Sequence, residues 1–181
     1  KFKMQYGTQK EYWTCLDLHA LTDVAQANIR EFQPDKPIYI AEFWGGRGIQ
    51  QGGFFARQKP EDVAANYKAI LEKGAFINFY MFCGGTNFGF MNGANHDGNE
   101  YMPTITSYDY GAPLSEAGDM TESYYAIKEV IEKNTGKKAP DIAVYDSPKA
   151  AYGKLELDEY APLMDNLSNI SSPIRAAYPQ T

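Results

Sequence analysis

The sequence of 181 residues is poor in cysteine, tryptophan and histidine, with two of each. Cys15 and Cys83 are too few and too far apart for a disulfide framework or a set of metal ligands, so we expect buried free thiols. His19 and His96 lack the partner pattern of a catalytic triad or a metal site, and we expect both to be structural or exposed. We therefore expect neither a metal nor another cofactor.

A positive charge excess and a long apolar run are also missing. Seventeen Lys and Arg residues against 23 Asp and Glu residues give a net charge of -6. Because nucleic-acid affinity rests largely on Lys and Arg neutralising phosphates, we exclude nucleic acid as a main partner. No apolar run reaches the roughly 18 residues of a membrane helix, so we expect no membrane span. The first residues carry neither a start Met nor a signal pattern, and we expect any targeting segment to lie outside this sequence.

What the sequence does contain is an alternation of apolar and amphipathic stretches. Strands are predicted over residues 12–18, 38–41 and 75–82, the last fully buried. Helices are predicted from Thr22 to Pro34, from Pro60 to Gly74 and from Thr121 to Gly136. Loops are expected over residues 1–10 and over the glycine-rich residues 45–58 and 83–94. Strands that alternate with helices predict an α/β fold with a parallel sheet.

Glu42 stands at the end of the predicted strand 38–41. With a side-chain period of two it shares a face with Ile38 and Ile40 and continues a row that would otherwise be core. The carboxyl end of a strand is where α/β sheets bind ligands. From this stretch alone, a catalytic acid and an acid that simply pairs with a neighbouring cation are equally good interpretations.

Three predicted strands are too few for a closed fold. They cannot form a barrel and would leave two open edges, which a stable protein avoids. The chain is therefore expected to be part of a larger fold. After Pro140 the hydrophobic pattern fades, and we expect residues 141–181 to be a connector without a helix, leading towards another domain.

Three segments carry a resemblance to a known family. They are PIYIAEFWGG (37–46), GAFINFYMFCGGTNFGFMNGAN (74–95) and PTITSYDYGAPLSEAGDMTESYYAIKEVI (103–131). Together they resemble the later part of the catalytic barrel of glycoside hydrolase family 35 β-galactosidases, most closely the lysosomal acid enzymes of animals. The segment PKAAYGKLELDEYAPL (148–163) resembles the stretch by which those enzymes leave the barrel and enter their β-rich domains.

The resemblance implies a fold and a reaction. Residues 1–140 would form strands six to eight of a (β/α)8 TIM barrel with their helices, and residues 141–181 a connector to β-rich domains absent from this chain. The reaction would be retaining hydrolysis of terminal β-galactosyl residues, with Glu42 at the position of the family's nucleophile. The family's acid/base glutamate follows the fourth strand, so we expect the upstream half of the barrel to be required and this chain to be inactive alone.

The resemblance also implies a galactose pocket lined by Tyr80, Tyr110 and Trp44. A Tyr110 phenol beside Glu42 could hydrogen-bond the ionised carboxylate and hold it ready for attack. Without the resemblance each residue has a simpler interpretation, because Tyr80 could be a core aromatic, Tyr110 a loop brace and Trp44 a cap on the barrel rim. With it, a site role is favoured for Tyr80 and Tyr110, and by a small margin for Trp44.

Some positions depart from the family pattern or imitate it. Arg47 stands where a tryptophan is expected, and Gly111 replaces an aspartate that usually follows Ser-Tyr-Asp-Tyr. Glu100 lies in an Asn-Glu-Tyr tripeptide like that of the family's acid/base residue, but in a variable loop, so we expect it to be solvated. Asp109 and Asn87 are interpreted as hydrogen-bonding braces of loops.

The resulting prediction is a β-galactosidase whose partner is a glycan with terminal β-galactose, located in the lysosome or secreted. Two alternatives stay open. One is a galactose-binding relative without catalysis, which the change at Arg47 makes conceivable, and the other is a related glycosidase with a different sugar preference.

Overall fold

The computed structural model describes residues 12–47, 50–54, 57–89, 91–140, 142–144 and 147–177. The loop predicted over residues 1–10 lies outside them. The chain divides into two compact units, residues 1–147 and residues 148–181. The first contains β1 (Leu16–Asp17), α1 (Asp23–Phe32), β2 (Tyr39–Phe43), α2 (Pro60–Glu72), β3 (Phe76–Phe79), β4 (Ala94–His96), β5 (Tyr101–Pro103) and α3 (Glu122–Thr135), and the second contains α4 (Leu163–Ile170).

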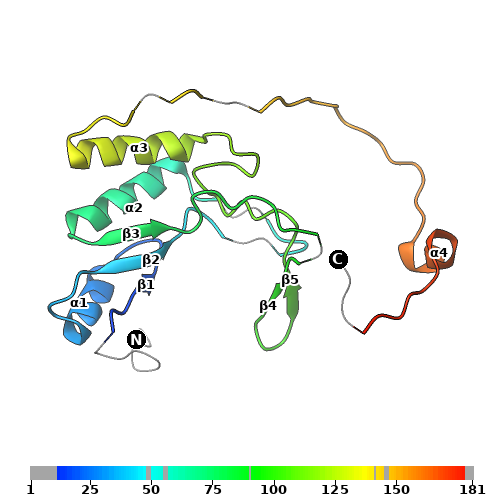
Figure 1. Cartoon of the computed structure of the whole chain (residues 1–181), viewed down its shortest axis with the longest axis horizontal. Helices are drawn as coiled ribbons and strands as arrows, with labels where there is room; N and C mark the ends of the chain where they lie inside the picture. The colour runs from blue at the N-terminus through cyan, green and yellow to red at the C-terminus, as the bar shows by residue number, and fades with distance from the viewer. Residues whose placement is uncertain are drawn as a thin grey trace. The chain divides into compact units, whose positions relative to one another are not determined.

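The main sheet of the first unit is parallel, as predicted. Its strand order is β1-β2-β3, so β2 is central and pairs on both sides (Figure 1). β1 and β3 are shorter than the stretches predicted from the sequence. For β3 the reason is the end of its partner, since the Tyr80 amide makes its bond to the carbonyl of Phe43, the last residue of β2, at 2.9 Å. Among the described residues, β2 offers β3 no pairing position beyond that point.

The three helices of the first unit begin and end where their sequences predict. The side-chain oxygens of Thr22 and Thr121 accept backbone amides of the first turns of α1 and α3. Pro60 begins α2, where its missing amide proton costs nothing. Gly136 ends α3 in the left-handed conformation at φ 67°, which glycine adopts without steric cost.

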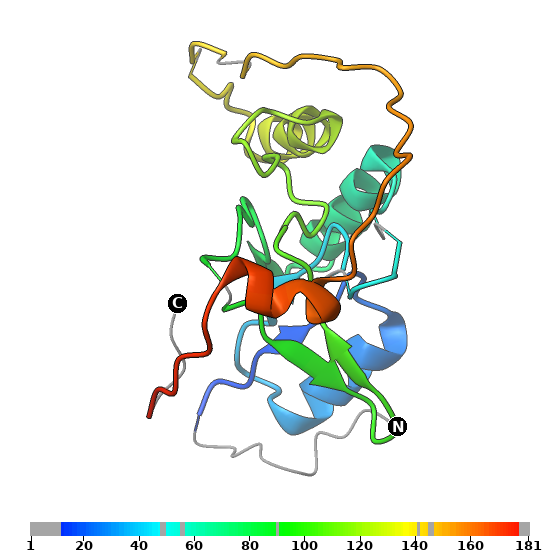
Figure 2. The same cartoon turned by 90° about the vertical axis from the view of Figure 1, so that its right-hand side faces the viewer.

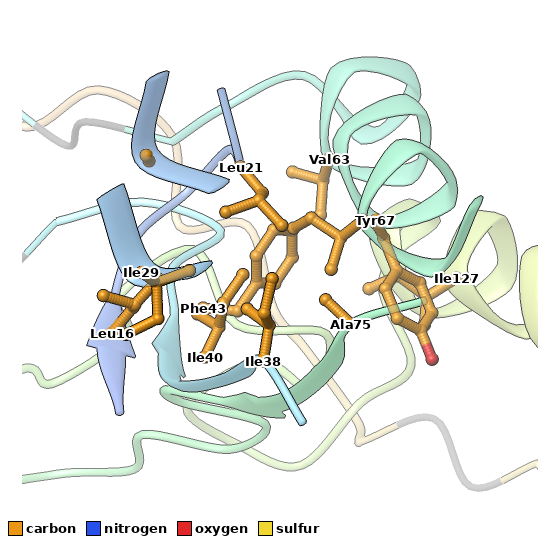
Figure 3. Packing of buried hydrophobic residues seen from close by; sticks show 12 residues of the cluster. Leu16, Leu21, Ile29, Ile38, Ile40, Phe43, Val63, Tyr67, Ala75 and Ile127 are labelled. Carbon is orange, nitrogen blue, oxygen red and sulfur yellow. The ribbon is translucent and has the colours of Figure 1, made fainter. Parts of the chain in front are cut away.

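The hydrophobic core lies between the sheet and these helices (Figure 3). It contains Leu16, Leu21, Ala25, Ile29, Ile38, Ile40, Phe43, Val63, Tyr67, Ile70, Ala75 and Ile127. Phe43 and Ile40 of the central strand are almost fully inaccessible to solvent. Burial of each such side chain stabilises the fold by about 1.5–3 kcal/mol. The amphipathic stripes read from the sequence therefore form one core on one face of the sheet.

The opposite face of the sheet is partly exposed among the described residues, and two predictions of burial fail. β3 is not fully buried, because Phe76 is 57% exposed and only the alternate positions face the helices. Cys15 and Cys83 are free thiols, as expected, but both are exposed. Cys15 precedes the buried Leu16 and so points away from the core, and Cys83 lies in the loop after β3.

The long connection between β3 and α3 contains a hairpin that the sequence does not predict. β4 and β5 pair antiparallel, with Asn95 opposite Met102 (Figure 2, green). The strands are three residues long and mostly exposed, so they lack the alternation of apolar and polar residues that marks a strand.

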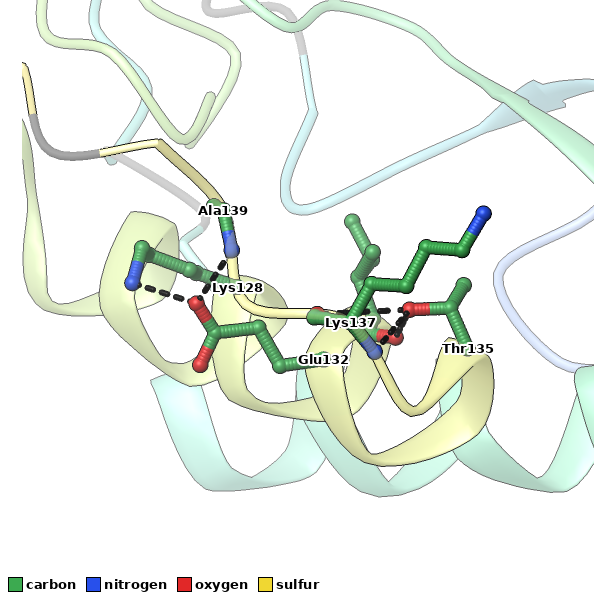
Figure 4. A network of polar contacts seen from close by, with 6 residues as sticks. Lys128, Glu132, Thr135, Lys137 and Ala139 are labelled. Atoms are coloured by element: carbon green, nitrogen blue, oxygen red, sulfur yellow. Dashed lines mark hydrogen bonds and ion pairs between the residues drawn. The ribbon is translucent and has the colours of Figure 1, made fainter.

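The chain leaves α3 through a small polar network (Figure 4). The Glu132 carboxylate accepts a hydrogen bond from Lys128 Nζ at 2.6 Å and one from the Ala139 amide at 2.9 Å. These two bonds lower the pKa of Glu132. The helix end and the segment after it are thereby joined through one side chain.

The second unit contradicts the expectation that no helix follows Pro140. α4 spans eight residues, and Leu163, Leu167 and Ile170 form a stripe at helical spacing on it. The Asn166 side chain donates to the carbonyl of Pro162 at 2.8 Å at its first turn. Two turns are too short for this stripe to stand out between prolines in the sequence. Among the described residues, no helix of either unit is both long and apolar enough to cross a membrane.

Substitution of a buried and of an exposed residue of α1 should change the free energy of unfolding by different amounts. Ile29→Ala should lower the free energy of unfolding by about 2–5 kcal/mol, because it opens a cavity where the side chain is 2% exposed. Val24→Ala, at a site 69% exposed, should change it by less than about 0.5 kcal/mol. Denaturant titration of the full-length protein checks both, and equal losses would contradict the assignment of the core face.

Candidate active site

Glu42 lies in β2 at a bulge that changes the direction of the side chains. Ile40 pairs with Ile77 and Phe43 with Phe79, so three steps along β2 match two along β3. Ile40 and Phe43 are buried in the core, whereas Glu42 is half-buried. The prediction that Glu42 continues the core row is therefore wrong. The bulge returns Phe43 to the core and turns Glu42 towards the opposite face of the sheet.

The Glu42 carboxylate is held by the side chain two residues later. Trp44 Nε1 donates a hydrogen bond to Glu42 Oε2 at 3.1 Å, which restricts the orientation of the carboxylate. On the neighbouring strand, Asp17 is the residue paired with Glu42. Partial burial and the negative charge of Glu42 raise the pKa of Asp17. Two carboxylates thus lie side by side where β1 and β2 end.

Three tyrosine rings pack together beyond the end of β3. The Tyr80 and Tyr108 hydroxyl oxygens are 2.6 Å apart and share a hydrogen bond. The ring of Tyr110 lies 5.4 Å from that of Tyr80 and 4.8 Å from that of Tyr108, measured between centroids. Burial, followed by the hydrogen bond with Tyr80, raises the pKa of Tyr108. The phenol therefore stays protonated over the working range of most enzymes.

Glycines allow the tyrosine segment, residues 106–113, to approach the loops after β2 and β3. A Cβ at Gly84 would lie 1.6 Å from the carbonyl oxygen of Tyr108, so the two backbones touch there. A Cβ at Gly111 would lie 2.7 Å from the carbonyl oxygen of Gly45, and Gly111 has φ +62°. The departure from the family pattern at Gly111 thus has a steric reason in this chain, because a side chain would collide with Gly45.

An ion pair fixes the same segment from the other side. Arg57 Nε and Nη2 donate to Asp109 Oδ1 and Oδ2, each at 2.9 Å, and Asp109 Oδ1 also accepts the Gly111 amide at 3.0 Å. Next to Arg57, Gln58 Nε2 donates to the carbonyl of Trp44 at 2.9 Å. Arg57 and Gln58, at the end of the loop after β2, therefore bind Asp109 and the Trp44 backbone respectively.

A hollow of about 580 Å³ opens between the loop after β2 and the β4–β5 hairpin. Trp44, Tyr108 and Tyr110 provide its aromatic walls, and Arg47, Gln50 and Asn95 are among its polar lining residues. Aromatic faces with a few side-chain amides are the combination that binds a polar ring such as a sugar.

The four predicted site residues come together around this hollow in different ways. Trp44 and Tyr110 line it, Tyr80 packs against Tyr110, and Glu42 is connected to it through Trp44. In the part of the chain that the structure describes, no hydrogen bond joins Tyr110 to Glu42. The expected bond from a phenol to the carboxylate is replaced by one from an indole.

Sequence reasoning missed three participants. Tyr108 belongs to the same Ser-Tyr-Asp-Tyr run as Tyr110, and the run itself was the signal. Asp17 follows an apolar stretch, as Glu42 does, and this position at a predicted strand end is a signal in the sequence. Arg57 gave no signal, because its partner Asp109 lies 52 residues away.

Asp109, Asn87, His19, His96 and Glu100 behave as expected. Asp109 and Asn87 brace loops, the latter by donating to the carbonyl of Ile105 at 3.2 Å. His19, His96 and Glu100 are exposed. Within the described ranges, no three His, Cys, Asp or Glu residues gather into a group that could hold a metal ion.

Comparison with known proteins gives consistent matches. The model of the family described as glycosyl hydrolases family 35 matches residues 2–134. The β-galactosidases of Mus musculus and Homo sapiens are 37% and 38% identical to the chain over 183 residues, and β-galactosidase-1-like protein 3 of Mus musculus is 33% identical over 178 residues. Each alignment covers 98% of this chain but only 28%, 26% and 27% of the respective relative. The chain therefore spans about a quarter of the length of these relatives.

The ion pair between Arg57 and Asp109 should contribute measurably to stability. A double-mutant cycle with Arg57→Gln and Asp109→Asn should give a coupling energy of about 1–3 kcal/mol, because both bonds are charge-assisted and the Asp109 side chain is only 9% exposed. The same cycle at Lys68 and Glu72, both more than 60% exposed, should give less than about 0.5 kcal/mol. Equal coupling in the two cycles would show that the Arg57 pair is only a surface contact.

The close approach at Gly84 should be intolerant of a side chain. Gly84→Ala should displace the backbone at Tyr108 and cost more stability than Gly85→Ala. The latter has φ +66° but open space around its Cβ, so its cost should be about 1–2 kcal/mol. Thermal unfolding measures both losses, and a larger loss for Gly85→Ala would contradict the docking of residues 106–113 described above.

Proposed function

The chain belongs to family 35 of the glycosyl hydrolases, and from this premise we propose that it forms part of an enzyme that hydrolyses terminal β-galactosyl residues of glycoconjugates. The observation that carries the proposal is the position of Glu42. A bulge turns it away from the core near the carboxyl end of a parallel sheet, beside Trp44 and a hollow lined by tyrosines. Such strand ends are where α/β enzymes bind their substrates.

We assign β1, β2 and β3 to strands six, seven and eight of a (β/α)8 barrel. In this assignment residues 1–140 end the barrel and residues 141–181 lead towards β-rich domains. The exposed face of the sheet supports it, since a barrel interior is filled by side chains from all its strands. Phe76, 57% exposed here, would meet such side chains from the rest of the barrel.

Glu42 is the proposed nucleophile of a double displacement. Its carboxylate attacks the anomeric carbon while the bond from that carbon to the leaving oxygen breaks, and a general acid protonates the leaving oxygen. Water then attacks the same carbon, the former acid takes a proton from the water, and Glu42 is released. The hydrogen bond from Trp44 supports this role because it orients the carboxylate without protonating it.

The acid/base residue is proposed to come from the upstream half of the barrel. Asp17 does not suit the role, although its pKa is raised. Residues paired on neighbouring strands lie side by side on one wall, whereas the acid and the nucleophile must flank the bond that is cleaved. Residues 1–181 alone are therefore expected to be inactive.

The aromatic residues are proposed to form the sugar pocket. Trp44 and Tyr110 offer ring faces to the C–H surface of galactose, and Tyr80 supports Tyr110 through their ring contact. Tyr108 adds a phenol that remains protonated. The resemblance to animal lysosomal enzymes further supports a lysosomal or secreted location.

Replacement of the nucleophile tests the proposal. In the full-length protein, Glu42→Gln should lower kcat for 4-nitrophenyl β-galactoside by about 10³-fold or more, because the attacking carboxylate is lost. Glu100→Gln is the matched control, since this glutamate is exposed in the hairpin loop, and it should keep the wild-type rate.

A second measurement separates the alternatives. A 2-fluoro-galactoside that traps the glycosyl-enzyme should label the peptide containing Glu42 in the wild type. A label on another residue, or an unchanged rate in Glu42→Gln, would refute the assignment of the nucleophile. Galactose binding without hydrolysis by the wild type would favour a non-catalytic relative, the alternative suggested by the change at Arg47. A faster reaction with another aryl glycoside would favour a related glycosidase with a different sugar preference.

A further inference from the structure

We propose that the leaving group of the preferred β-galactoside carries a carboxylate, and that Arg47 binds it. This inference rests on the proposed function and specifies the substrate class of the same site. It starts from the charges around the hollow between the loop after β2 and the β4–β5 hairpin.

The hollow is lined by aromatic rings, amides, the hydroxyls of Thr104, Tyr108 and Tyr110, and a single charged side chain among the described residues. That side chain is Arg47, which is exposed, and no described Asp or Glu lines the hollow. Gln50 and Asn95, which can donate hydrogen bonds from their amide groups, lie among the same lining residues. The local charge of the hollow is therefore positive, although the chain as a whole carries a net charge of -6.

A second hollow of about 310 Å³ adjoins the first and repeats this charge pattern. The two share Trp44, Gly46 and Arg47, and the second adds His19 and Arg57 without a described acidic lining residue. Arg57 is already paired with Asp109 through two hydrogen bonds. Arg47 thus lines both hollows. Because the charge of Arg57 is balanced by Asp109, Arg47 provides the remaining positive charge.

Trp44 connects Glu42 to the two hollows that Arg47 lines. The indole N–H binds the Glu42 carboxylate, while the same residue lines both hollows. In this proposal, a substrate whose reacting carbon is at Glu42 extends its leaving group past Trp44 towards Arg47. A carboxylate suits this end because a guanidinium donates two parallel hydrogen bonds to it.

Two matched substrates test the inference in the full-length protein. They are 3-carboxy-4-nitrophenyl β-galactoside and its methyl ester, which differ in charge at one position. The ratio of kcat/KM for the acid to that for the ester should fall roughly tenfold in Arg47→Gln and largely recover in Arg47→Lys. Raising the salt concentration should lower the same ratio in the wild type but not in Arg47→Gln.

Arg175→Gln is the control, because this arginine is exposed and is not among the residues that line the two hollows, and it should leave the ratio unchanged. An equal ratio in wild type and Arg47→Gln would overturn the inference while hydrolysis of the ester still upheld the proposed function. If neither substrate is hydrolysed, the proposed function fails. Calorimetry then decides the inference, with analogues of the acid and the ester in which sulfur replaces the glycosidic oxygen. Arg47→Gln must still weaken binding of the acid analogue relative to the ester analogue.

Discussion

The bulge in β2 is the feature on which the rest of the site depends. A regular strand would alternate strictly, so Glu42 would enter the core between the sheet and the helices, where an unpaired carboxylate costs several kcal/mol. Ile40 pairs with Ile77 and Phe43 with Phe79, so β2 has one residue more than β3 between these pairs. The extra residue reverses the alternation of side chains between the two faces of β2. Phe43 then completes the core against Tyr67 and Phe79, and Glu42 is released to the other face. One local irregularity thus serves both the packing of the core and the placement of a carboxylate near the strand end.

The loops at the strand ends are held by contacts between segments that are distant in the chain. Backbone meets backbone at Gly84 with Tyr108 and at Gly45 with Gly111, and the ion pair of Arg57 with Asp109 closes the arrangement. Glycine is needed at these contacts because a Cβ would occupy the space of a carbonyl oxygen. The glycine richness of the loops therefore reflects close packing as much as freedom of the backbone, and it gives the tyrosine rings a defined position.

The chain spans about a quarter of its relatives, and its sheet shows features expected of part of a larger fold. One face carries the helices and a complete core. The other carries the exposed Phe76 and, at the bulge, Glu42, and no described residue is seen to cover it, while the aromatic residues of the candidate site lie in the loops at the strand ends. The core therefore lies on one side of the three strands, and Glu42 turns to the other side near their carboxyl ends.

The sequence by itself determined the parallel α/β pattern, the caps of three helices and the family, because these depend on local periodicity, on capping residues such as Thr22, Pro60 and Gly136, and on long distinctive motifs. It also drew attention to Glu42, Tyr80, Tyr110 and Trp44. Only the tertiary structure decided that Glu42 leaves the core row, that Trp44 is its hydrogen-bond donor and that Arg57 holds Asp109. Each of these depends on register or on contacts between distant segments, and a one-residue shift in pairing or a partner 52 residues away leaves no periodic trace in the sequence.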